Sequence, residues 1–281
     1  MTRISFVNGK FLPHDQCFVH IEDRGLQFAD GVYEVILFKN KQFVDLARHL
    51  TRLLRSLNEM HIKIEQSKEE ITQILQDLLQ KNNIADGAIY LQVNRGAAPR
   101  AQGLPDCTAS IIATVKNLAI GGQNLRTIFV EDIRWGRCDI KSIALFAGCL
   151  AKQTAVEKGA DDAIFVKNGA VQEGSFANIF MVDDEGILTT PGTKQNILGG
   201  ITRRRILQLA QKNNIKTAER PINQDEILQA KEVFFTSSSL LIRPVVQIEE
   251  DIIGGGKVGP LTQKLQKIYN NFIDEETNKK I

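Results

Sequence analysis

A short polar connector, Gly121-Gly-Gln-Asn124, constrains the fold of this chain more than any other segment. Glycines and small polar residues without an apolar period are typical of loops rather than of helices or strands. Strand-like and helix-like patterns alternate on both sides of it. The 281 residues are enough to bury two separate cores. We therefore predict an N-terminal domain over residues 1–120 and a C-terminal domain over residues 121–281.

Hairpins and amphipathic helices alternate in the predicted first domain. The dipeptide Asn8-Gly9 is typical of a tight turn between antiparallel strands. After Asp45, which is suited to cap a helix, leucines follow one another at helical spacing. The patterns predict strands at residues 4–7, 10–12, 32–38, 43–44, 88–93 and 109–115, and helices at about residues 46–60 and 68–80. These elements favour an α+β layer.

The predicted second domain also mixes strands and helices. The patterns predict strands at residues 127–130, 163–166, 179–182, 187–188, 232–236 and 241–248, and helices at about residues 143–156, 200–212, 225–230 and from Pro260 onward. No internal repeat is visible. The sequence as a whole predicts an α/β (α+β) fold.

The charges of the chain exclude several classes of partner. The formal net charge is +2, with 35 basic and 33 acidic residues, so no overall field favours nucleic acid or an anionic membrane. Arg203-Arg-Arg205 lies on a predicted helix with an apolar opposite side and no aromatic platform, which favours a solvated helix face. Gly254-Gly-Gly-Lys-Val-Gly259 fits GxGxxG, but too little chain follows to complete a dinucleotide-binding unit, so a glycine turn is favoured.

Cysteine and histidine are too scattered to suggest a metal site. The four cysteines form no CxxC pair and the four histidines form no HxxxH pattern, so we expect neither a metal nor a disulfide framework. Nothing resembles a signal segment or a spanning stretch of about 20 apolar residues. We therefore expect no membrane partner and a cytoplasmic location.

Lys141 is the first candidate for chemistry. It follows the apolar run Thr127-Ile-Phe-Val130 and comes just before the predicted helix at residues 143–156. A lysine at such a junction can lose its proton through desolvation and become a nucleophile. On this segment alone, an ordinary solvated lysine is the favoured interpretation.

Two further features suit a cofactor that bears a phosphate. In Asn196-Ile-Leu-Gly-Gly-Ile-Thr202, two glycines precede a predicted helix, so free N–H groups and the positive end of the helix dipole meet at one point. Thr236-Ser-Ser-Ser239 offers more hydroxyl donors, and Arg52 could complete the charge neutralisation. Each piece by itself is more often a cap or a turn.

Glu173 supplies the third feature, a carboxylate between strand-like segments. Pyridoxal phosphate withdraws electrons only when its ring nitrogen is protonated, and a buried acid beside that nitrogen keeps the proton in place. A lysine, a carboxylate and a phosphate-binding helix start are the minimum set for this cofactor.

The sequence resembles the fold-type IV (class IV) pyridoxal-phosphate enzymes, which include the D-amino acid and branched-chain aminotransferases and aminodeoxychorismate lyase. The resemblance covers essentially the whole chain and is closest to the D-specific branch, the D-amino acid aminotransferases. The segments that carry it are Glu22-Asp-Arg-Gly-Leu-Gln-Phe-Ala-Asp-Gly-Val-Tyr-Glu34, Asp132-Ile-Arg-Trp135, Arg137-Cys-Asp-Ile-Lys-Ser142, Leu150-Ala-Lys-Gln153, Glu173-Gly-Ser175 with Asn178, and Gly200-Ile-Thr-Arg203.

The resemblance implies a two-domain subunit that works as a homodimer. It implies a smaller N-terminal α/β domain, a larger C-terminal domain with a β-barrel-like core, and pyridoxal 5'-phosphate in the cleft between the domains. Lys141 then matches the Schiff-base lysine and proton shuttle, and Glu173 matches the partner of the pyridine nitrogen. The other matched residues are Arg52, Ile201, Thr202, Ser237 and Ser238 at the phosphate, Leu198 against the ring, and Tyr33 and Arg100 at the substrate carboxylate.

The implied reaction is a ping-pong transamination by way of pyridoxamine phosphate. A D-amino acid such as D-alanine would exchange its amino group with a 2-oxo acid such as 2-oxoglutarate or pyruvate. The alternatives are aminodeoxychorismate lyase, a branched-chain L-amino acid or R-amine transaminase, and a catalytically silent binding protein on the same scaffold, which would be expected to lose the lysine or the carboxylate.

Two departures from the D-specific pattern affect the choice of substrate. Arg100-Ala-Gln102 stands where that branch has Arg-x-His, so Gln102 can donate a hydrogen bond to the substrate but cannot supply charge, and Arg95 could share the task. Phe176-Ala177 stands where two serines are usual, which predicts a more apolar pocket wall.

Overall fold

The computed structural model describes residues 3–118 and 122–278. The chain divides into two compact units. The first consists of Met1–Ala119, Ile140–Ala144 and Asp274–Ile281, and the second of Ile120–Asp139 and Leu145–Ile273. The mixed two-domain fold predicted from the sequence is confirmed, and two segments from the second half of the chain belong to the first unit. The predicted boundary at residue 120 and the start of the connector at residue 121 lie outside the described residues.

A six-stranded antiparallel sheet forms the centre of the first unit. Along the described residues its order is β2 (Lys10–Pro13), β1 (Ile4–Val7), β6 (Ser110–Asn117), β5 (Gly87–Asn94), β3 (Gly31–Lys39) and β4 (Gln42–Phe43). The predicted strands are all present. The longest pairing joins β3 to β5, from Gly31 opposite Asn94 to Phe38 opposite Gly87.

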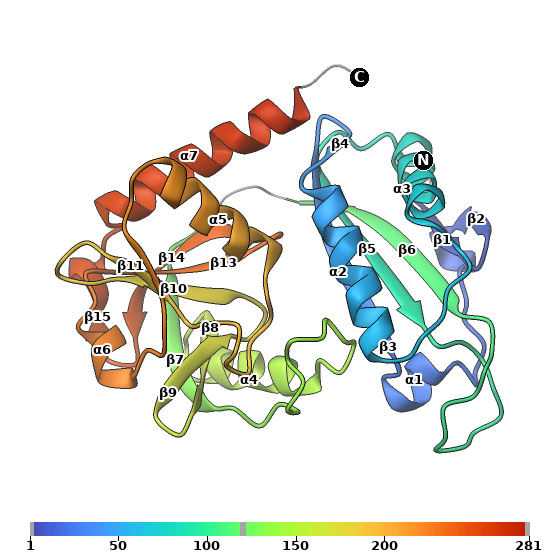
Figure 1. The fold of residues 1–281 in the computed structure, drawn as a ribbon, viewed down its shortest axis with the longest axis horizontal. Helices are drawn as coiled ribbons and strands as arrows, with labels where there is room; N and C mark the ends of the chain where they lie inside the picture. Colours follow the sequence, from blue (N-terminus) through green and yellow to red (C-terminus); the bar gives the residue numbers. More distant parts are fainter. Residues whose placement is uncertain (1–2, 119–121, 279–281) are drawn as a thin grey trace. The chain divides into compact units, whose positions relative to one another are not determined.

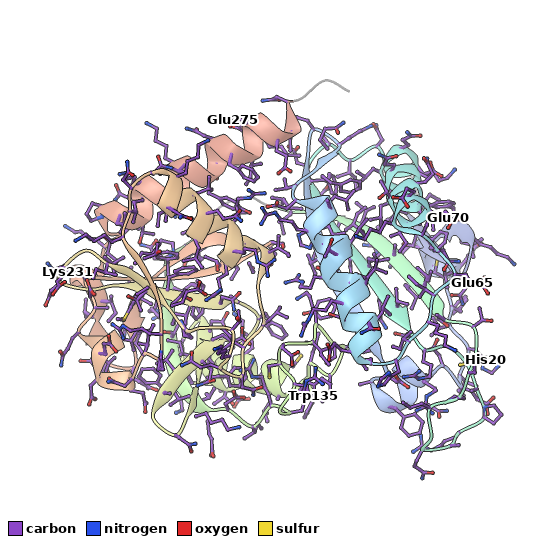
Figure 2. All side chains as sticks on the ribbon, in the orientation of Figure 1. His20, Glu65, Glu70, Trp135, Lys231 and Glu275 are labelled. Carbon is purple, nitrogen blue, oxygen red and sulfur yellow. The ribbon has the colours of Figure 1, made fainter. Side chains whose placement is uncertain are left out.

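Two helices, α2 (Leu46–Glu59) and α3 (Lys68–Asn82), pack against this sheet (Figure 1). Their leucines share one apolar core with Val32, Ile36 and Phe38 of β3. A capping box starts α3, because the Ser67 hydroxyl accepts from the Glu70 N–H and the Glu70 carboxylate accepts from the Ser67 N–H. Figure 2 labels Glu70. The short helices η1 (His14–Gln16) and α1 (Arg24–Phe28) complete the unit.

Asp45 precedes α2 as predicted, but its side chain makes no capping hydrogen bond. Its backbone is left-handed, with φ of 56°, and its carboxylate lies 3.1 Å from Arg48 instead. The helix therefore begins at the predicted place with an ion pair in its first turn rather than a side-chain cap.

The second unit is built on a sheet of nine described strands. The order is β12 (Thr217–Glu219), β11 (Leu188–Thr190), β10 (Asn178–Val182), β13 (Glu232–Ser237), β14 (Leu241–Ile248), β7 (Leu125–Glu131), β8 (Asp162–Lys167) and β9 (Ala170–Gly174), with β15 (Asp251–Ile252) paired to β14. The Gly174 N–H donates to the Ala177 carbonyl where β9 passes to β10, so the sheet curls into the predicted barrel-like core.

Apolar side chains fill the inside of this curled sheet. Phe235, Val245 and Ile179 belong to one buried cluster with Ile164 and Val171. The unit contains α4 (Phe146–Glu157), α5 (Ile201–Lys212), α6 (Gln224–Leu228) and α7 (Pro260–Thr277) up to Ile273. Helix α4 packs on β7 and β8 in Figure 1. None of the helices among residues 3–118 and 122–278 is long and apolar enough to span a membrane.

The structure corrects four local predictions. Helix α4 begins at Phe146 rather than residue 143, because Ile143 donates to the Gly31 carbonyl and continues the edge of β3. Glu173 lies within strand β9, not between strands. The glycine run at 254–256 forms the short helix η2 (Ile253–Gly256) rather than a hairpin.

Arg203 is the fourth correction, because it is buried rather than solvated. Its guanidinium donates to the Pro191 carbonyl at 2.7 Å and to the Glu219 carboxylate at 2.6 Å. Arg204 is exposed and Arg205 stacks on Phe272 at 4.1 Å, so only part of the basic run faces solvent.

Candidate active site

The predicted site residues fall into two sets, one in each unit. The first unit carries Tyr33, Arg52, Arg100, Gln102 and Lys141. The second unit carries Glu173, Leu198, Ile201, Thr202, Ser237 and Ser238. Each set is described within its own unit.

Lys141 lies on a short segment that extends the sheet of the first unit at the edge of β3. The Tyr33 N–H donates to the Lys141 carbonyl at 2.9 Å, and Ser142 forms a bridge with Val32. The Nζ atom of Lys141 lies 4.1 Å from the centroid of the Tyr33 ring. The backbone of the lysine is therefore fixed by β3, and its amine rests over the electron-rich face of a tyrosine.

Tyr33 is itself held by its neighbours. Its ring stacks on Tyr90 with centroids 5.6 Å apart, and it is almost fully buried. Burial raises the pKa of Tyr90 to about 12, with a contribution from Tyr33. The Tyr90 phenol is therefore a neutral hydrogen-bonding group over the physiological pH range.

Arg52 is anchored on a fully buried carboxylate, Glu34. The guanidinium donates from Nε to Oε1 at 2.8 Å and from Nη2 to Oε2 at 2.6 Å. The Nδ1 atom of His49, one turn earlier on α2, lies 2.7 Å from Oε2. Burial alone would raise the pKa of Glu34, but the Arg52 charge and hydrogen bonds, together with His49, outweigh it and lower that pKa to about 2.

The Arg100 loop is tied down by residues other than the predicted ones. Arg95 is buried and donates to Asp30 at 2.7 Å and to the carbonyls of Met60 and His61, so its guanidinium is engaged within the first unit. Arg100 is exposed and stacks on Phe28 at 4.5 Å.

Arg24 fixes the next residue of that loop. It donates to Asp30 at 2.8 Å and to the Ala101 carbonyl at 2.7 Å, so the peptide between Arg100 and Gln102 has a fixed support. Arg24 also stacks on Phe28 at 4.5 Å. Gln102 is exposed.

Glu173 lies at the centre of a hydrogen-bond network in the second unit. Its Oε1 accepts from Arg134 Nη1 at 2.5 Å, its Oε2 accepts from Asn178 Nδ2 at 2.9 Å, and the Leu198 N–H points at both oxygens from 3.2 and 3.3 Å. Arg134 also binds the buried Asp132, donating from Nε and Nη2 at 2.8 Å each. Burial by itself would lower the pKa of Arg134, but the bonds to Asp132 and Glu173 raise it, so the cation persists.

Asn178 connects this carboxylate to the start of α5. Its Nδ2 donates both to Glu173 and to the Leu198 carbonyl, at 2.9 and 2.8 Å. A Cβ atom on Gly200 would lie 2.0 Å from the Asn178 Oδ1. Glycine is therefore required at position 200 for the amide to fit between the carboxylate and the helix.

The first turn of α5 has the form of an anion site. Gly200 is its N-cap with no side-chain capping bond, and its first turn contains no acidic residue. Ile201 and Thr202 begin the helix and are buried. Orphan N–H groups at the start of a twelve-residue helix favour a bound anion such as a phosphate.

The Ser237 turn lies at the end of β13. The Ser237 Oγ accepts from the Leu240 N–H at 3.0 Å and lies 3.3 Å from the Ser239 Oγ. Ser238 is the next residue of this turn. The turn is thus closed by its own hydroxyl, which keeps that hydroxyl in one position.

The family is shown by comparison with known proteins. The family described as amino-transferase class IV matches residues 31–248. A D-alanine aminotransferase of Bacillus licheniformis is 40% identical over 279 residues, which cover 98% of this chain and 98% of that protein. One from Staphylococcus haemolyticus is 36% identical and covers 99% and 100%. The chain belongs to the class IV aminotransferases.

Its fold agrees with solved members of this group. The branched-chain amino acid aminotransferase of Escherichia coli superposes with a TM-score of 0.90 at 23% identity, covering 100% of this chain and 97% of that one. The two-domain fold expected from the sequence is therefore also the fold of the Escherichia coli enzyme.

Sequence reasoning missed the partners that hold the site residues of this aminotransferase. Arg134 and Asn178 lie in segments that carry the family resemblance, but the sequence pattern predicts no role for either residue. Glu34 and His49 could have been found, because a charged residue in the apolar run of β3 needs a cation from the helix that covers it. No comparable sequence pattern predicts that Arg134 binds Glu173, because the two residues are 39 positions apart.

Proposed function

We propose that this class IV aminotransferase uses pyridoxal 5'-phosphate to transfer the amino group of a D-amino acid, such as D-alanine, to a 2-oxo acid. The D-alanine aminotransferases that match it over its whole length support the substrate class. The observation that carries the cofactor assignment is Glu173, an anionic carboxylate fixed by three donors and linked by Asn178 to an uncapped helix start.

The residues of the second unit fit the cofactor at both ends. The Glu173 carboxylate, oriented by Arg134, Asn178 and the Leu198 N–H, is the type of group that would keep a proton on a pyridine nitrogen. The Ile201 and Thr202 N–H groups, the Thr202 hydroxyl and the hydroxyls of Ser237 and Ser238 suit a phosphate. The backbone N–H of Leu198 donates to Glu173, so the Leu198 side chain is suited to pack on the pyridine ring beside that carboxylate.

Bound pyridoxal phosphate would supply an electron sink for the carbanion left when the substrate loses its Cα proton. Lys141 would hold the cofactor through its amine until the amine of the substrate takes its place. The free Nζ would then carry the proton between the substrate Cα and the C4′ atom of the cofactor, in either direction, as both halves of a ping-pong exchange require.

Arg52 would add positive charge to the phosphate while Glu34 holds its guanidinium in place. Tyr33 and Arg100 would bind the substrate carboxylate, with Gln102 as a neutral donor. Phe176, half-exposed beside Gly148, would give the pocket an apolar wall. We propose a cytoplasmic homodimer as the working form.

The experiment is a set of separate half-reactions. The holoenzyme is mixed with D-alanine, D-glutamate, L-leucine or an R-amine, and the absorbance of the bound cofactor is followed in a stopped-flow instrument. D-alanine and D-glutamate are expected to bleach the cofactor band. Bleaching by L-leucine alone would show a branched-chain enzyme, and release of pyruvate from aminodeoxychorismate without amino transfer would show the lyase.

Lysine variants test the role of Lys141 in the same assay. Lys141→Ala is expected to abolish turnover and the absorbance of the covalently attached cofactor. Lys264→Ala, at an exposed position on α7, is the matched control and should retain both. Turnover by the Lys141→Ala protein would refute the assignment.

A further inference from the structure

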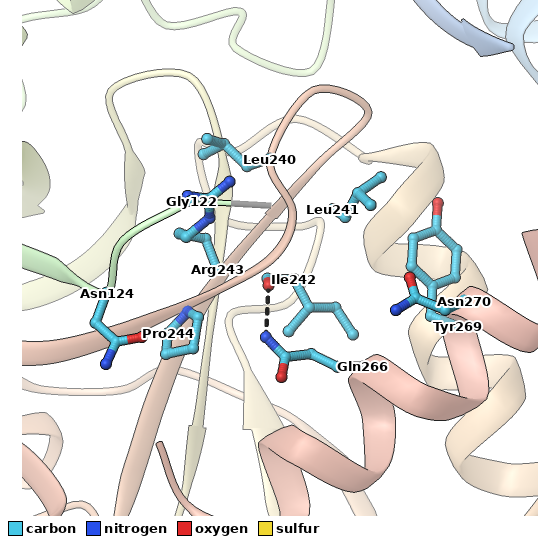
Figure 3. Close-up of a pocket in the computed structure, with 10 residues that line it drawn as sticks. All are labelled: Gly122, Asn124, Leu240, Leu241, Ile242, Arg243, Pro244, Gln266, Tyr269 and Asn270. Atoms are coloured by element: carbon cyan, nitrogen blue, oxygen red, sulfur yellow. Dashed lines mark hydrogen bonds between the residues drawn. The ribbon is translucent and has the colours of Figure 1, made fainter. Parts of the chain in front are cut away.

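The pocket in Figure 3 lies in the second unit and contains none of the residues assigned to the cofactor or the substrate. It has a volume of about 260 Å³ and is lined mainly by residues around the start of β14 and by helix α7. Two of its polar side chains bind the protein itself, since Gln266 donates to the Ile242 carbonyl at 3.1 Å and Arg243 donates to the Gln123 carbonyl at 3.3 Å. The pocket therefore indicates no particular ligand, whereas a chain of polar groups in the first unit ends beside a residue of the proposed site.

This chain of hydrogen bonds runs along one face of the sheet in the first unit. It follows alternate residues of β5, because side chains two positions apart point to the same face. The Tyr90 hydroxyl donates to Gln92 Oε1 at 2.6 Å, and Gln92 Nε2 donates to Asn94 Oδ1 at 2.7 Å. Asn94 Nδ2 then donates to Asp23 Oδ1 at 2.7 Å. We refer to these four side chains as the β5 chain.

Asp23 sets the direction of the β5 chain. Its Oδ1 also accepts from the Gly25 N–H at 2.8 Å, so this oxygen is an acceptor. Asn94 must therefore turn its amide N–H group toward Asp23, which leaves the Asn94 oxygen for the amide of Gln92. The oxygen of Gln92 is left for the Tyr90 hydroxyl in the same way. Tyr90 is therefore the donor, and its hydrogen points into the chain.

The other oxygen of Asp23 is not explained by folding. The Oδ2 atom is buried and has no hydrogen-bond partner among the described residues. A buried oxygen without a partner lowers stability. Such groups are expected where function, rather than stability, requires the residue. Asp23 is therefore a candidate for a role in the site.

The Asn94 amide is held between two glycines. A Cβ atom on Gly25 would lie 2.2 Å from Asn94 Nδ2, and a Cβ atom on Gly31 would lie 2.4 Å from Asn94 Oδ1. Neither glycine has a positive φ, so the space taken by the amide, rather than the backbone conformation, requires glycine at both positions. The amide in the middle of the β5 chain is thus fixed from two sides.

The far end of the β5 chain lies close to Lys141. The Tyr90 ring stacks on the Tyr33 ring with centroids 5.6 Å apart and planes at 28°. Tyr33 lies directly opposite Gln92 in the β3–β5 pairing, so its side chain is on the face of the β5 chain. The Nζ atom of Lys141 lies 4.1 Å from the centroid of the Tyr33 ring. A hydrogen bond at the Tyr90 oxygen restrains the tilt of that ring and therefore of the ring stacked on it.

We propose that the β5 chain positions the Tyr33 ring, and with it the amine of Lys141. Its members Asp23, Asn94 and Gln92 are then positioning residues, since they act through Tyr90 rather than on the substrate. This inference rests on the proposed function, in which Tyr33 binds the substrate carboxylate and Lys141 moves the proton. A change in the tilt of one ring would displace both groups.

Fluorine NMR of the holoenzyme labelled with fluorotyrosine tests the positioning without turnover. The sequence has three tyrosines, Tyr33, Tyr90 and Tyr269, so each signal can be assigned from a Tyr→Phe variant. Gly25→Ala displaces the Asn94 amide at the end of the chain that is remote from the tyrosines. It should move the Tyr90 and Tyr33 signals by more than their line widths and leave the Tyr269 signal in place.

Gly103→Ala is the matched control, because a Cβ atom there would meet nothing within 4 Å. It should leave all the tyrosine signals in place. An unmoved Tyr33 signal in a folded Gly25→Ala protein would overturn the proposal.

The half-reaction with D-alanine tests whether Gln92 acts through the Tyr90 hydroxyl. Gln92→Met keeps the length of the side chain but removes both hydrogen bonds, and should slow the half-reaction about tenfold. In a Tyr90→Phe background the same substitution should slow it less than about twofold, because the hydroxyl that Gln92 holds is already absent. Gln42→Met, at a half-buried position on the edge strand β4 of the same sheet, is the control and should react at the wild-type rate. Equal slowing by Gln92→Met in both backgrounds would assign Gln92 a merely structural role and refute the proposal.

The two measurements separate this inference from the proposed function. A wild-type holoenzyme that reacts with no D-amino acid would refute the proposed substrate class, while the fluorine spectra would still decide whether the β5 chain positions Tyr33. Circular dichroism and the melting temperature establish that each variant is folded. Gly25→Ala and Gln92→Met break different bonds of the chain, so either one that folds is sufficient for the fluorine test.

Discussion

Two buried ion clusters in different units have opposite arrangements of charge. In the first unit, one carboxylate, Glu34, pairs with two basic groups, Arg52 and His49. In the second unit, one guanidinium, Arg134, pairs with two carboxylates, Asp132 and Glu173. The first cluster has a formal charge of zero with a neutral His49 and +1 with a protonated one, whereas the second has −1.

This difference suits the two clusters to different chemical groups. A cluster that is neutral or positive can present Arg52 to a phosphate, because no excess negative charge opposes the anion. A cluster with one excess negative charge can hold a proton on a pyridine nitrogen. The two clusters therefore have separable roles. Substitutions in the two clusters should lower stability and activity in different proportions.

Arg134→Met has the largest expected effect on stability. It leaves Asp132 and Glu173 buried without their shared cation, and breaking a buried pair costs about 3–5 kcal/mol, here toward the upper end because two carboxylates are affected. Urea unfolding at pH 7 measures this loss. The matched control is Arg137→Met in the same loop, whose ion pair with Asp139 is partly exposed and contributes less than about 1 kcal/mol.

Glu34→Gln is expected to cost about 3 kcal/mol of unfolding free energy. The amide keeps the shape of the side chain but leaves Arg52 and His49 without their carboxylate in a fully buried place. Glu65→Gln, at an exposed position in the same unit, is the control and should unfold at the wild-type urea concentration. Equal stability of Glu34→Gln and wild type would show that the first cluster contributes nothing to folding.

The same carboxylate predicts a window of acid sensitivity. The pKa of Glu34 is lowered from 4.5 to about 2, so its contribution is fully present above pH 4.5 and is lost as the pH falls from there through 2. A shift of this size corresponds to about 3 kcal/mol. Subtracting the pH profile of Glu34→Gln from that of wild type should isolate this loss. A difference that is constant from pH 5 to about 2 would contradict the lowered pKa.

Gly200→Ala should weaken the cofactor site and should cost less stability than Arg134→Met or Glu34→Gln. The new methyl group would displace the Asn178 amide, and with it the bonds to Glu173 and to the Leu198 carbonyl. Loss of one or two such bonds corresponds to about a tenfold rise in the cofactor dissociation constant, measurable by fluorescence titration. Gly199→Ala is the neighbouring control, because its Cβ would meet only Thr193 at 3.9 Å.

Most of the longer strands and helices are predictable because each has a local apolar period, but α1, β9, β12 and β15 are not among the predicted elements. Even so, the edge strand formed by Lys141 to Ile143 could not be distinguished from the start of α4, since its pairing partner, β3, lies about a hundred positions earlier. The same limit applies to Arg203, whose basic neighbours suggested solvent while distant carbonyls and Glu219 bury it.

The site residues were found by motif, but their supports were not. Glu173 and Lys141 stand in recognisable segments, and a glycine pair before a helix is a visible sign of an anion site. Arg134, Asn178 and Arg24 act through contacts with residues far away in the sequence, so only the folded chain reveals them. Arg95 is the opposite case. Its position in a polar loop suggested carboxylate binding, but in the folded chain its buried guanidinium donates to Asp30.

The most direct test of the central claim is the half-reaction of Glu173→Gln with D-alanine, followed at a single turnover beside wild type and Glu34→Gln. We predict that Glu173→Gln stays folded, because Arg134 keeps Asp132 as a partner, and that its rate falls about a hundredfold or more, since the amide cannot hold the pyridine proton. The main effect of Glu34→Gln should be a loss of stability rather than of rate. A wild-type rate in a folded Glu173→Gln holoenzyme would contradict the account.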